Sequence, residues 1–304
     1  MTIERVCVHP SRPSPSPEDL LDRLVKDWTY RPSGFSLRTR LARIRAVLIG
    51  SRPAAPHLVL RPVTPRPRWS FYFVYLPDGR LTPAHEFTLA RLSKLDAALL
   101  VICAAPSPDD VPPELFEYAD AVCWKGLPGY DFSAYAIGLW EIAERSAGAD
   151  VLILNDSVYG PFGDLAEWLA RAQWDLTGFT ASAMIENHVQ SYAFQLRAVT
   201  PETLLQLRPV FPRDTAFSRP RDVIALQETR MARVASAAGL SVGAFWYAGP
   251  AAGDPSLAAA IPLIRSGFPF LKRGLFTKAQ GFFSRADLCG LLEEKGHPIP
   301  TFRT

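Results

Sequence analysis

Three consecutive polar residues, Asn155, Asp156 and Ser157, are well suited to chemistry by their type and position. They end and follow an apolar run at residues 150–156 (DVLILND), which predicts a strand buried on both faces. Their oxygen atoms can bind a divalent cation or the hydroxyl groups of a sugar. Because only Asp156 is acidic, a cation held by these residues alone would bind weakly. The alternative is an Asx turn that ends the strand.

A second candidate is Glu228, in the predicted helix at residues 227–239 (QETRMARVASAAG), which Gly239 would end. A carboxylate placed beside a ligand can act as a general base, because it accepts a proton from an attacking hydroxyl group. The alternative is structural: a negative charge near a helix start stabilises the helix by about 0.3–1 kcal/mol. The residue type and position alone favour this structural alternative.

Several common catalytic and binding motifs are absent from the sequence. It contains no GxGxxG, no GxxxxGK[ST] and no GxSxG, so the sequence supports neither a dinucleotide fingerprint, a P-loop nor a hydrolase nucleophile elbow. The five histidines are dispersed, and the four cysteines form no CxxC pair. The spacing of these residues therefore predicts no zinc site and no disulfide framework.

The candidate residues are positioned by elements that alternate between strand and helix after Trp69. The expected strands are residues 71–76, 98–105, 120–126 and 150–156, and the helices between them are residues 83–95, 114–119 and 132–146. This alternation predicts an α/β fold with a mostly parallel central sheet flanked by helices. Ligands bind at the carboxyl ends of such strands. Tyr75, Asp131 and Asp156 are therefore expected to surround a nucleoside diphosphate. Further strands are expected at residues 175–182, 188–197 and 242–247, and a helix at residues 201–209.

The first 68 residues differ in charge from the rest of the chain. They hold 13 Lys and Arg residues against five Asp and Glu, while the whole chain has a net charge of only +3. The excess suggests an anionic partner, such as a membrane surface or a nucleic acid, or a solvated tail with no partner. We therefore divide the chain into a basic extension (residues 1–68) and a main domain (residues 69–304).

Within the extension, the sequence predicts a disordered lead-in at residues 10–17, a helix at residues 17–28 and a proline-rich linker at residues 52–68. Residues 35–49 place leucine and isoleucine at steps of three or four with arginines between them. Such a basic amphipathic helix can lie on an anionic membrane. The alternative, which we favour, is a helix packed on the main domain.

No apolar run approaches the roughly 20 residues that cross a bilayer, and the first 16 residues lack the apolar core of a signal peptide. A cytoplasmic protein is expected, with peripheral contact to the inner membrane as an option.

Taken together, six segments resemble the rhamnan synthesis protein F family of bacterial glycosyltransferases. They are GYDFSAYAIGL (129–139), NDSVYGP (155–161), DLTGFTAS (175–182), HVQSYAF (188–194), QETRMARVASAAG (227–239) and GFPFLKRGL (267–275). The resemblance covers roughly residues 70–280. It implies a GT-A-like domain with a nucleotide-binding half (69–160), and an acceptor-binding half with a C-terminal tail (161–304). It also implies inverting transfer from a donor such as dTDP-L-rhamnose to a cell-surface polysaccharide or a lipid-linked glycan.

The resemblance also suggests roles for individual residues. The donor would be faced by Asp131, Asn155, Asp156 and Ser157, to which the strand ends add Tyr75. The sugar or acceptor would be faced by His188 and Gln190. Glu228 would be the base. Lys272 and Arg273 would neutralise the leaving pyrophosphate, as a cationic pair can do in place of a metal. Asp156 would bind Mg²⁺ or Mn²⁺ if the reaction uses a metal.

Two other functions remain as alternatives. A degenerate transferase domain could act as a glycan-binding or assembly subunit, because a single acid stands where such transferases usually carry an Asp-x-Asp motif. A nucleic-acid binder is disfavoured, because few aromatic residues lie among the N-terminal arginines and the main domain is acidic.

Overall fold

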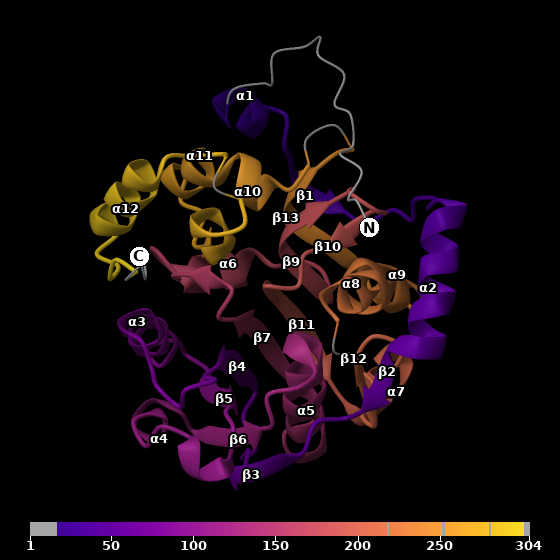
Figure 1. The fold of residues 1–304 in the computed structure, drawn as a ribbon, viewed down its shortest axis with the longest axis vertical. Helices are drawn as coiled ribbons and strands as arrows, with labels where there is room; N and C mark the ends of the chain where they lie inside the picture. Colours follow the sequence, from indigo (N-terminus) through magenta and orange to yellow (C-terminus); the bar gives the residue numbers. More distant parts are fainter. Residues whose placement is uncertain (1–16, 218, 251–252, 280, 301–304) are drawn as a thin grey trace, which may run out of the picture.

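The computed structural model describes residues 17–217, 219–250, 253–279 and 281–300, and Figure 1 shows their arrangement. The predicted lead-in at residues 10–17 therefore lies outside the described residues, except for its last residue. Within the described part, no helix has the length and apolarity needed to cross a membrane.

A large mixed sheet runs through the molecule. Its strand order is β1 (Val25–Thr29), β13 (Val242–Ala248), β9 (Leu176–Ser182), β11 (Ala193–Val199), β7 (Ala149–Asn155), β4 (Arg68–Tyr75), β5 (Ala98–Ala104), β6 (Ala121–Lys125) and β3 (His57–Arg61), and β10 (His188–Val189) pairs with β9. Pairing is parallel across β7–β4–β5–β6 and between β9 and β13, and antiparallel at the other pairs. The predicted α/β class is confirmed, but the sheet is mixed rather than mostly parallel.

Helices cover both faces of this sheet. They are α1 (Pro17–Asp22), α2 (Leu37–Gly50), α3 (Pro83–Leu92), α4 (Leu115–Tyr118), α5 (Tyr130–Arg145), α6 (Leu165–Arg171), α7 (Pro201–Leu207), α8 (Pro220–Val223), α9 (Thr229–Ala237), α10 (Pro255–Ala258), α11 (Ala260–Arg265) and α12 (Arg285–Glu294). Short helical turns span Pro108–Asp110 and Arg273–Phe276, and a π-helical turn spans Ile224–Glu228. Two small sheets pair β2 (Ser51–Pro53) with β12 (Thr215–Phe217), and β8 (Val158–Tyr159) with β14 (Leu271–Lys272).

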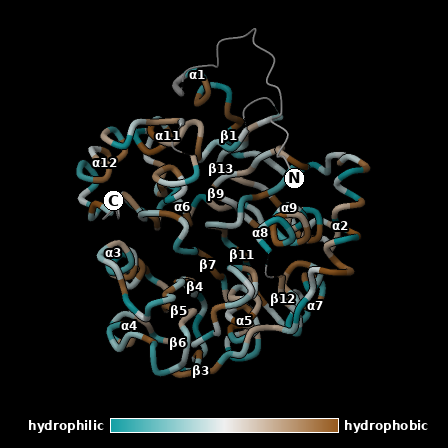
Figure 2. The backbone as a smooth tube through the Cα atoms, viewed as in Figure 1, coloured by the Kyte–Doolittle hydropathy of each residue, from teal (hydrophilic) through white to brown (hydrophobic). Residues whose placement is uncertain are grey.

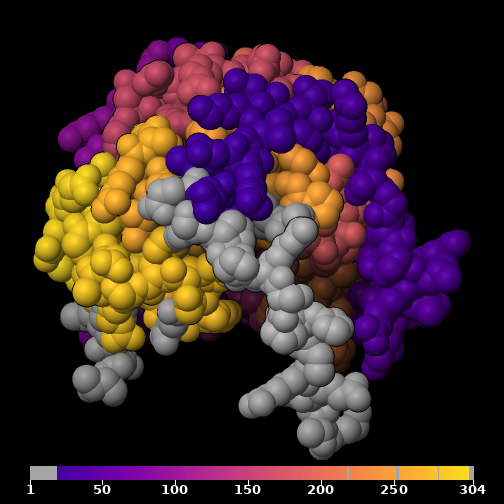
Figure 3. All heavy atoms as spheres, turned by 90° about the horizontal axis from the view of Figure 1, so that it is seen from above, coloured from indigo at the N-terminus to yellow at the C-terminus, as the bar shows by residue number. Residues whose placement is uncertain are grey.

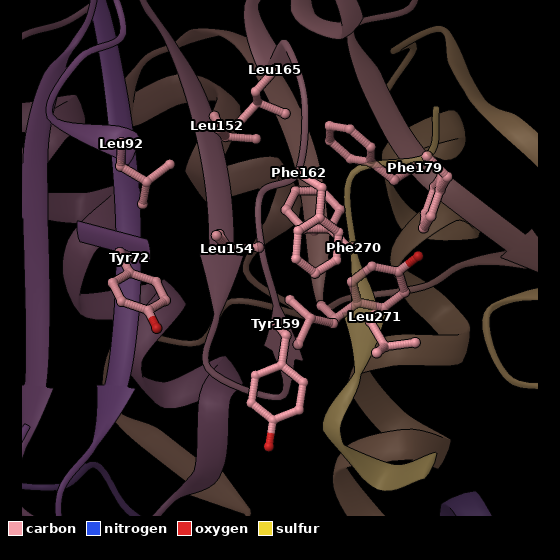
Figure 4. Close-up of a cluster of buried hydrophobic side chains, with 14 of the residues drawn as sticks. Tyr72, Leu92, Leu152, Leu154, Tyr159, Phe162, Leu165, Phe179, Phe270 and Leu271 are labelled. Carbon is pink, nitrogen blue, oxygen red and sulfur yellow. The ribbon is translucent and has the colours of Figure 1, made fainter. Parts of the chain in front are cut away.

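Strand β4 shows how the core is divided between the two faces. Phe71 and Phe73 point into one hydrophobic cluster, with α5, while Tyr72 and Val74 point into the other, with α3. Alternate residues of a strand face opposite sides, so a strand in the middle of the sheet must be apolar throughout. Figure 4 shows the second cluster, where side chains from the sheet meet residues that follow β7 and residues near β14.

The chain reverses its direction across the sheet at β4. Strands β4, β5 and β6 follow each other outward, and α5 then returns the chain to β7 on the other side of β4. Helices α3 and α5 consequently lie on opposite faces, and the loops that follow β4 and β7 diverge. The carboxyl ends of these two strands form the place where an open α/β sheet binds ligands.

Two predictions for the N-terminal segment were wrong. Residues 25–29 are the strand β1 rather than the end of a helix, because they pair with β13 and Trp28 stacks on Tyr247 at a ring-centroid distance of 4.3 Å. The expected linker contains β3, which pairs with β6 along the opposite edge. Contacts with distant strands override the local pattern in both cases. The division at residue 68 stays a prediction, although the segment before it supplies both edge strands.

Two predicted elements of the main domain were also placed wrongly. The expected strand at residues 188–197 is divided into β10 and β11, and both parts pair with β9. The helical run that contains Glu228 begins at Pro220, so Glu228 lies at a π-helical turn inside the run. Because the charge is two turns from the helix start, the macrodipole alternative for Glu228 is wrong.

Helix α2 forms where the sequence predicts it and packs on the main domain, as the favoured alternative expects. Its buried Arg43 forms an ion pair with Glu186, whose side chain is fully buried and also pairs with Arg233. Arg43 further donates hydrogen bonds to the Ala225 carbonyl at 2.8 Å and to Thr229 at 3.0 Å. The helix is therefore attached by a buried ionic contact.

We expect Arg43→Met to lower the free energy of unfolding by about 3 kcal/mol, because it leaves a buried carboxylate with one counter-ion instead of two. Arg45→Met, on the exposed side of the same helix, should change it by less than about 0.5 kcal/mol. Urea unfolding in lipid-free buffer measures both. Equal stability of the two variants would show that the ion pair does not anchor the helix.

Candidate functional site

A cavity of about 610 Å³ opens at the carboxyl ends of β4, β6 and β7. It is lined by Phe73, Tyr75, Leu127, Pro128, Gly129, Tyr130, Asp131, Asn155, Asp156 and Ser157. The structure thus brings together five residues that the sequence analysis proposes for the donor site. Its volume lies within the range of roughly 300–1,000 Å³ that is typical of small-molecule sites.

The loop between β6 and α5 is shaped for this position. Gly129 has a φ of +102°, and a Cβ atom there would lie 2.6 Å from Ser133 Oγ, so the turn requires glycine. The next residue, Tyr130, adopts a φ of +50°, which costs energy for a residue with a side chain. The buried Lys125 holds the loop by donating to the carbonyls of Gly126 (2.8 Å) and Pro128 (2.7 Å). Burial lowers the pKa of Lys125 to about 8, although nearby Asp131 favours the charged form.

A chain of hydrogen bonds leads from the cavity wall into the protein. Asn155 donates from Nδ2 to Asp131 Oδ2 at 3.1 Å and to the Tyr135 hydroxyl at 2.8 Å. Tyr135 donates to the Ser191 carbonyl at 2.8 Å. The amide and hydroxyl of Ser191 donate to Glu228 Oε1 at 3.2 and 3.1 Å. Glu228 is therefore connected to the cavity through this chain, although it is not among the residues that line the cavity.

Asp131 is half-buried in the cavity wall, and of the groups in the site its protonation matters most for catalysis. Burial raises its pKa to about 7, and the negative charge of Glu228 adds to the rise, while hydrogen bonds from the Phe132 amide and Asn155 oppose it. A carboxylate with a pKa near neutrality is suited to general base catalysis, because it is partly ionised and still basic at that pH. Perturbed acids of this kind concentrate at functional sites.

Asp156 lies on the other side of the cavity among donors and cations. Its Oδ2 accepts a hydrogen bond from the Tyr75 amide at 3.0 Å and lies 3.6 Å from Arg273 Nη1. Arg273 also donates to the Asp156 carbonyl at 2.7 Å, and its guanidinium lies over the Tyr159 ring at 5.2 Å. Arg273 is thus held by both the backbone and the side chain of the cavity residue Asp156, although Arg273 is not itself among the residues that line the cavity.

The Asx-turn alternative is confirmed for the neighbouring residue. Asn155 Oδ1 accepts from the Ser157 amide at 3.0 Å and from the Ser157 hydroxyl at 2.5 Å. The side-chain nitrogen Nδ2 of Asn155 donates a hydrogen bond to Asp131, so this one side chain both ends the strand and positions a carboxylate.

The sequence analysis missed His85, which is buried beside Asp156. The Thr82 amide donates to His85 Nδ1 at 3.2 Å in a capping box at the start of α3. The other ring nitrogen, Nε2, lies 3.6 Å from Asp156 Oδ2 and 3.4 Å from Arg273 Nη1. The pattern Thr-Pro-x-His indicates the cap, but it does not show that the cap faces the end of β7.

Lys272 and Arg273 are adjacent in sequence but have different partners. Lys272 Nζ pairs with Asp254 Oδ2 at 2.7 Å and lies 5.0 Å from the centre of the Tyr192 ring. Burial alone would raise the pKa of Asp254, but Lys272 and further hydrogen bonds bring it below its usual value. In the structure the two cations contact different acids, Lys272 the Asp254 side chain and Arg273 the Asp156 side chain, and their joint role at a pyrophosphate stays a prediction.

The two residues proposed for the acceptor are buried outside the cavity wall. Gln190 donates to Asp254 at 2.8 Å, and it therefore belongs to the network of Lys272. His188 Nδ1 lies 2.8 Å from the Glu186 carbonyl, near the anchor of α2. Their proposed roles stay predictions, as does that of Glu228.

A metal site built by the protein alone does not fit the residues present. Across the described residues, no group of three or more His, Cys, Asp and Glu side chains gathers as a metal site would require. The one acid at the end of β7, Asp156, already faces Arg273 and an amide donor. The use of Mg²⁺ or Mn²⁺ therefore stays a prediction that would need ligands from a bound substrate.

Comparisons with known proteins do not assign the chain to a family. No family model and no curated protein matches the sequence. Similar solved structures include a protein from Desulfovibrio desulfuricans G20 that is provisionally described as a nucleotide-diphospho-sugar transferase. The two sequences are 12% identical, and the match covers 77% of this chain and 96% of the other with a TM-score of 0.37. A likeness this distant assigns no activity, so the resemblance to the rhamnan synthesis protein F family stays a prediction.

The raised pKa of Asp131 predicts a pH-dependent stability. Between about pH 4 and pH 7 the unfolded chain loses the Asp131 proton while the folded protein keeps it, so this group lowers stability as the pH rises. We expect Asp131→Asn to stabilise the protein at pH 8 by up to about 4 kcal/mol, and to leave its stability nearly unchanged at pH 4. Urea unfolding at the two pH values measures the difference.

The exposed Asp109 provides a matched control, and Asp109→Asn should change stability by less than about 0.5 kcal/mol at either pH. A gain for Asp131→Asn that is the same at pH 4 and pH 8 would contradict the raised pKa.

Proposed function

We propose that this protein transfers a sugar from a nucleoside diphosphate carrier to a hydroxyl group of a glycan, with inversion at the anomeric carbon. The observation that carries the proposal is the cavity at the ends of β4 and β7. It has a carboxylate with a pKa of about 7 on one wall and the arginine-bound Asp156 on the other. Such a site offers a base for the attacking hydroxyl group and a cation for a leaving phosphate.

The donor fits the chemistry of the cavity wall. Tyr75 and Tyr130 are exposed there and offer aromatic surfaces for a nucleobase, beside the buried Phe73. A pyrophosphate can compete with the Asp156 carboxylate for the guanidinium of Arg273, because both are anions that accept charge-assisted hydrogen bonds. The sugar would then lie between the pyrophosphate and Asp131.

The reaction that we propose exchanges one bond for another at the anomeric carbon. The acceptor oxygen forms a bond to this carbon while the bond from the carbon to the phosphate oxygen breaks. The nucleoside diphosphate leaves with the electron pair of that bond, and Arg273 stabilises its charge. The hydroxyl proton moves to Asp131, which releases it to solvent after the reaction.

Asp131 is preferred to Glu228 as the base because of its position. Asp131 lines the cavity, whereas the Glu228 carboxylate lies outside the cavity lining and accepts two hydrogen bonds from Ser191. The charge of Glu228 raises the pKa of Asp131 and so makes it a stronger base. Glu228, the base expected from the family resemblance, remains the competing candidate.

The finer assignment rests on the resemblance alone. It comprises a GT-A-like architecture, a dTDP-L-rhamnose-like donor, and a cell-surface polysaccharide or a lipid-linked glycan as acceptor. A degenerate transferase domain that binds a glycan without catalysis is the alternative. The raised pKa of Asp131 in the cavity wall supports an enzyme, because strongly perturbed acids in clefts concentrate at catalytic sites.

Donor binding should depend on Arg273 and not on Lys272. We expect Arg273→Ala to weaken the binding of the nucleotide sugar by about 10- to 100-fold, since it removes a charge-assisted hydrogen bond. Lys272→Ala should leave this affinity within about twofold but destabilise the fold by about 3 kcal/mol, because Asp254 loses its counter-ion. Calorimetric titration with UDP-, GDP- and dTDP-sugars and urea unfolding give the two quantities. Equal losses of affinity in both variants would support the cationic pair that the sequence suggests.

The turnover rates of variants at Asp131 and Glu228 should show which of the two carboxylates is the base. We expect Asp131→Asn to lower kcat by about 10²- to 10⁴-fold with donor affinity nearly unchanged. In the wild type, kcat/KM should fall as the pH decreases through about 7, because the base becomes protonated. Glu228→Gln should retain kcat within about tenfold and move this fall to lower pH. Release of the nucleoside diphosphate from the donor that binds best provides the assay.

The opposite pattern, a large loss in Glu228→Gln and near-normal turnover in Asp131→Asn, would make Glu228 the base. Donor binding without turnover in the wild type, with every acceptor offered and in water alone, would favour the non-catalytic alternative.

A further inference from the structure

Helix α2 presents a stripe of large apolar side chains to solvent. Leu37, Leu41, Ile44 and Leu48 are 77%, 67%, 51% and 79% exposed. The helix lies at the outer edge of the molecule, and Figure 3 shows the N-terminal part of the chain on its outside. Figure 2 shows that hydrophobic and hydrophilic residues alternate along α2. Exposed apolar groups gathered on one face of a helix indicate a surface that meets something other than water.

This apolar stripe points directly away from the protein. The residues of α2 that are buried are Arg43, Ala46 and Gly50. Counted at about 100° per residue, these four residues fall within an arc of about 60°, and the other exposed apolar residues of the helix, Val47 and Ile49, lie about 60° and 80° outside it on opposite sides. The centre of this arc lies about 160° from the centre of the buried stripe. One side of the helix is therefore buried against the protein, and the opposite, apolar side has no partner among the described residues.

The charges around the stripe have one sign. On the same angular count, Arg40 lies along one border of the stripe, and Arg38 and Arg45 lie along the other. No Asp or Glu occurs between Asp27 and Asp78, whereas this segment holds nine arginines. An apolar stripe between two rows of arginine is complementary to a surface that is anionic outside and apolar beneath.

The anchor of α2 prevents the stripe from turning inward. Arg43 is fixed by Glu186 and Thr229, and its guanidinium lies 4.5 Å from the centre of the Phe35 ring, just before the helix. Rolling the helix to bury its leucines would break this buried ion pair, at a cost of several kcal/mol. The stripe is therefore held outward by the fold.

We propose that α2 docks the protein on an anionic lipid bilayer, with its axis parallel to the surface. The leucines and the isoleucine would enter the boundary between headgroups and acyl chains, while the arginines bind lipid phosphates. A second copy of the chain is the poorer occupant, because a symmetric contact would place arginine against arginine. Duplex DNA would leave the apolar stripe in water. This proposal is independent of the glycosyl transfer proposed above.

Vesicle sedimentation of the full-length protein tests the proposal. The vesicles contain either phosphatidylcholine alone or equal parts of phosphatidylcholine and phosphatidylglycerol. We expect binding to the anionic vesicles and little to the neutral ones. Leu37→Ser/Leu41→Ser/Leu48→Ser should lower the partition coefficient at least about tenfold, because the apolar contact is lost. Arg38→Gln/Arg45→Gln should lower it by about 20-fold at low ionic strength and by less at physiological ionic strength.

Met184→Ser/Leu205→Ser is the matched control, since these residues are 69% and 59% exposed elsewhere on the surface. It should bind the anionic vesicles as the wild type does. Urea unfolding checks that every variant is folded. The proposal is overturned if the wild type ignores anionic vesicles, if it binds neutral vesicles equally well, or if the leucine variant binds undiminished. A concentration-dependent dimer in sedimentation velocity that the leucine variant abolishes would assign the stripe to a second copy instead.

Discussion

The reversal of chain direction at β4 is the constraint on which the rest of the structure depends. A parallel sheet that grows outward through β5 and β6 and then continues at β7 must send its crossover helices to opposite faces. The loops after β4 and β7 are thereby directed to opposite faces, and the cavity lies at this edge of the sheet. The strand ends themselves stay joined, because Asp156 accepts a hydrogen bond from the Tyr75 amide and donates one to the Phe73 carbonyl. The strand order therefore determines where the cavity lies, more than any single side chain does.

The buried acids of the molecule have two kinds of electrostatic environment. Asp254 and Glu186 have cationic partners, and the pKa of Asp254 lies below its usual value as a result. The pKa of Asp131 is instead raised by burial, and the charge of a second carboxylate, Glu228, adds to the rise. The acid whose charged form is disfavoured in this way lies in the wall of the cavity at the ends of β4, β6 and β7. That contrast sets Asp131 apart from the acids that only hold the structure together.

The sequence predicts what depends on neighbouring residues and on strand order. The strands from β4 to β7 are apolar because both faces are covered, so their ends, and with them Tyr75, Asp131 and Asp156, could be located in advance. The sequence does not predict features that depend on contacts between residues far apart in the chain. The helical spacing of Leu20, Leu21 and Leu24 extends to Val25, but Val25 begins β1, whose strand conformation comes from pairing with β13, more than 200 residues away. His85 and Asp254 were missed because their partners, Asp156 and Lys272, are remote in sequence. No local pattern shows that Lys272 and Arg273 diverge.

The origin of the edge strands has a consequence for synthesis on the ribosome. β1 is made early, but its only strand neighbour in the described sheet, β13, follows after roughly 10–45 s at typical elongation rates of about 5–20 residues per second. During this interval β1 cannot complete its pairing, and the arginine-rich segment beside it leaves the ribosome without its acidic partner Glu186. The arginine-rich segment and β1 therefore stay without these partners until Glu186 and then β13 have been made.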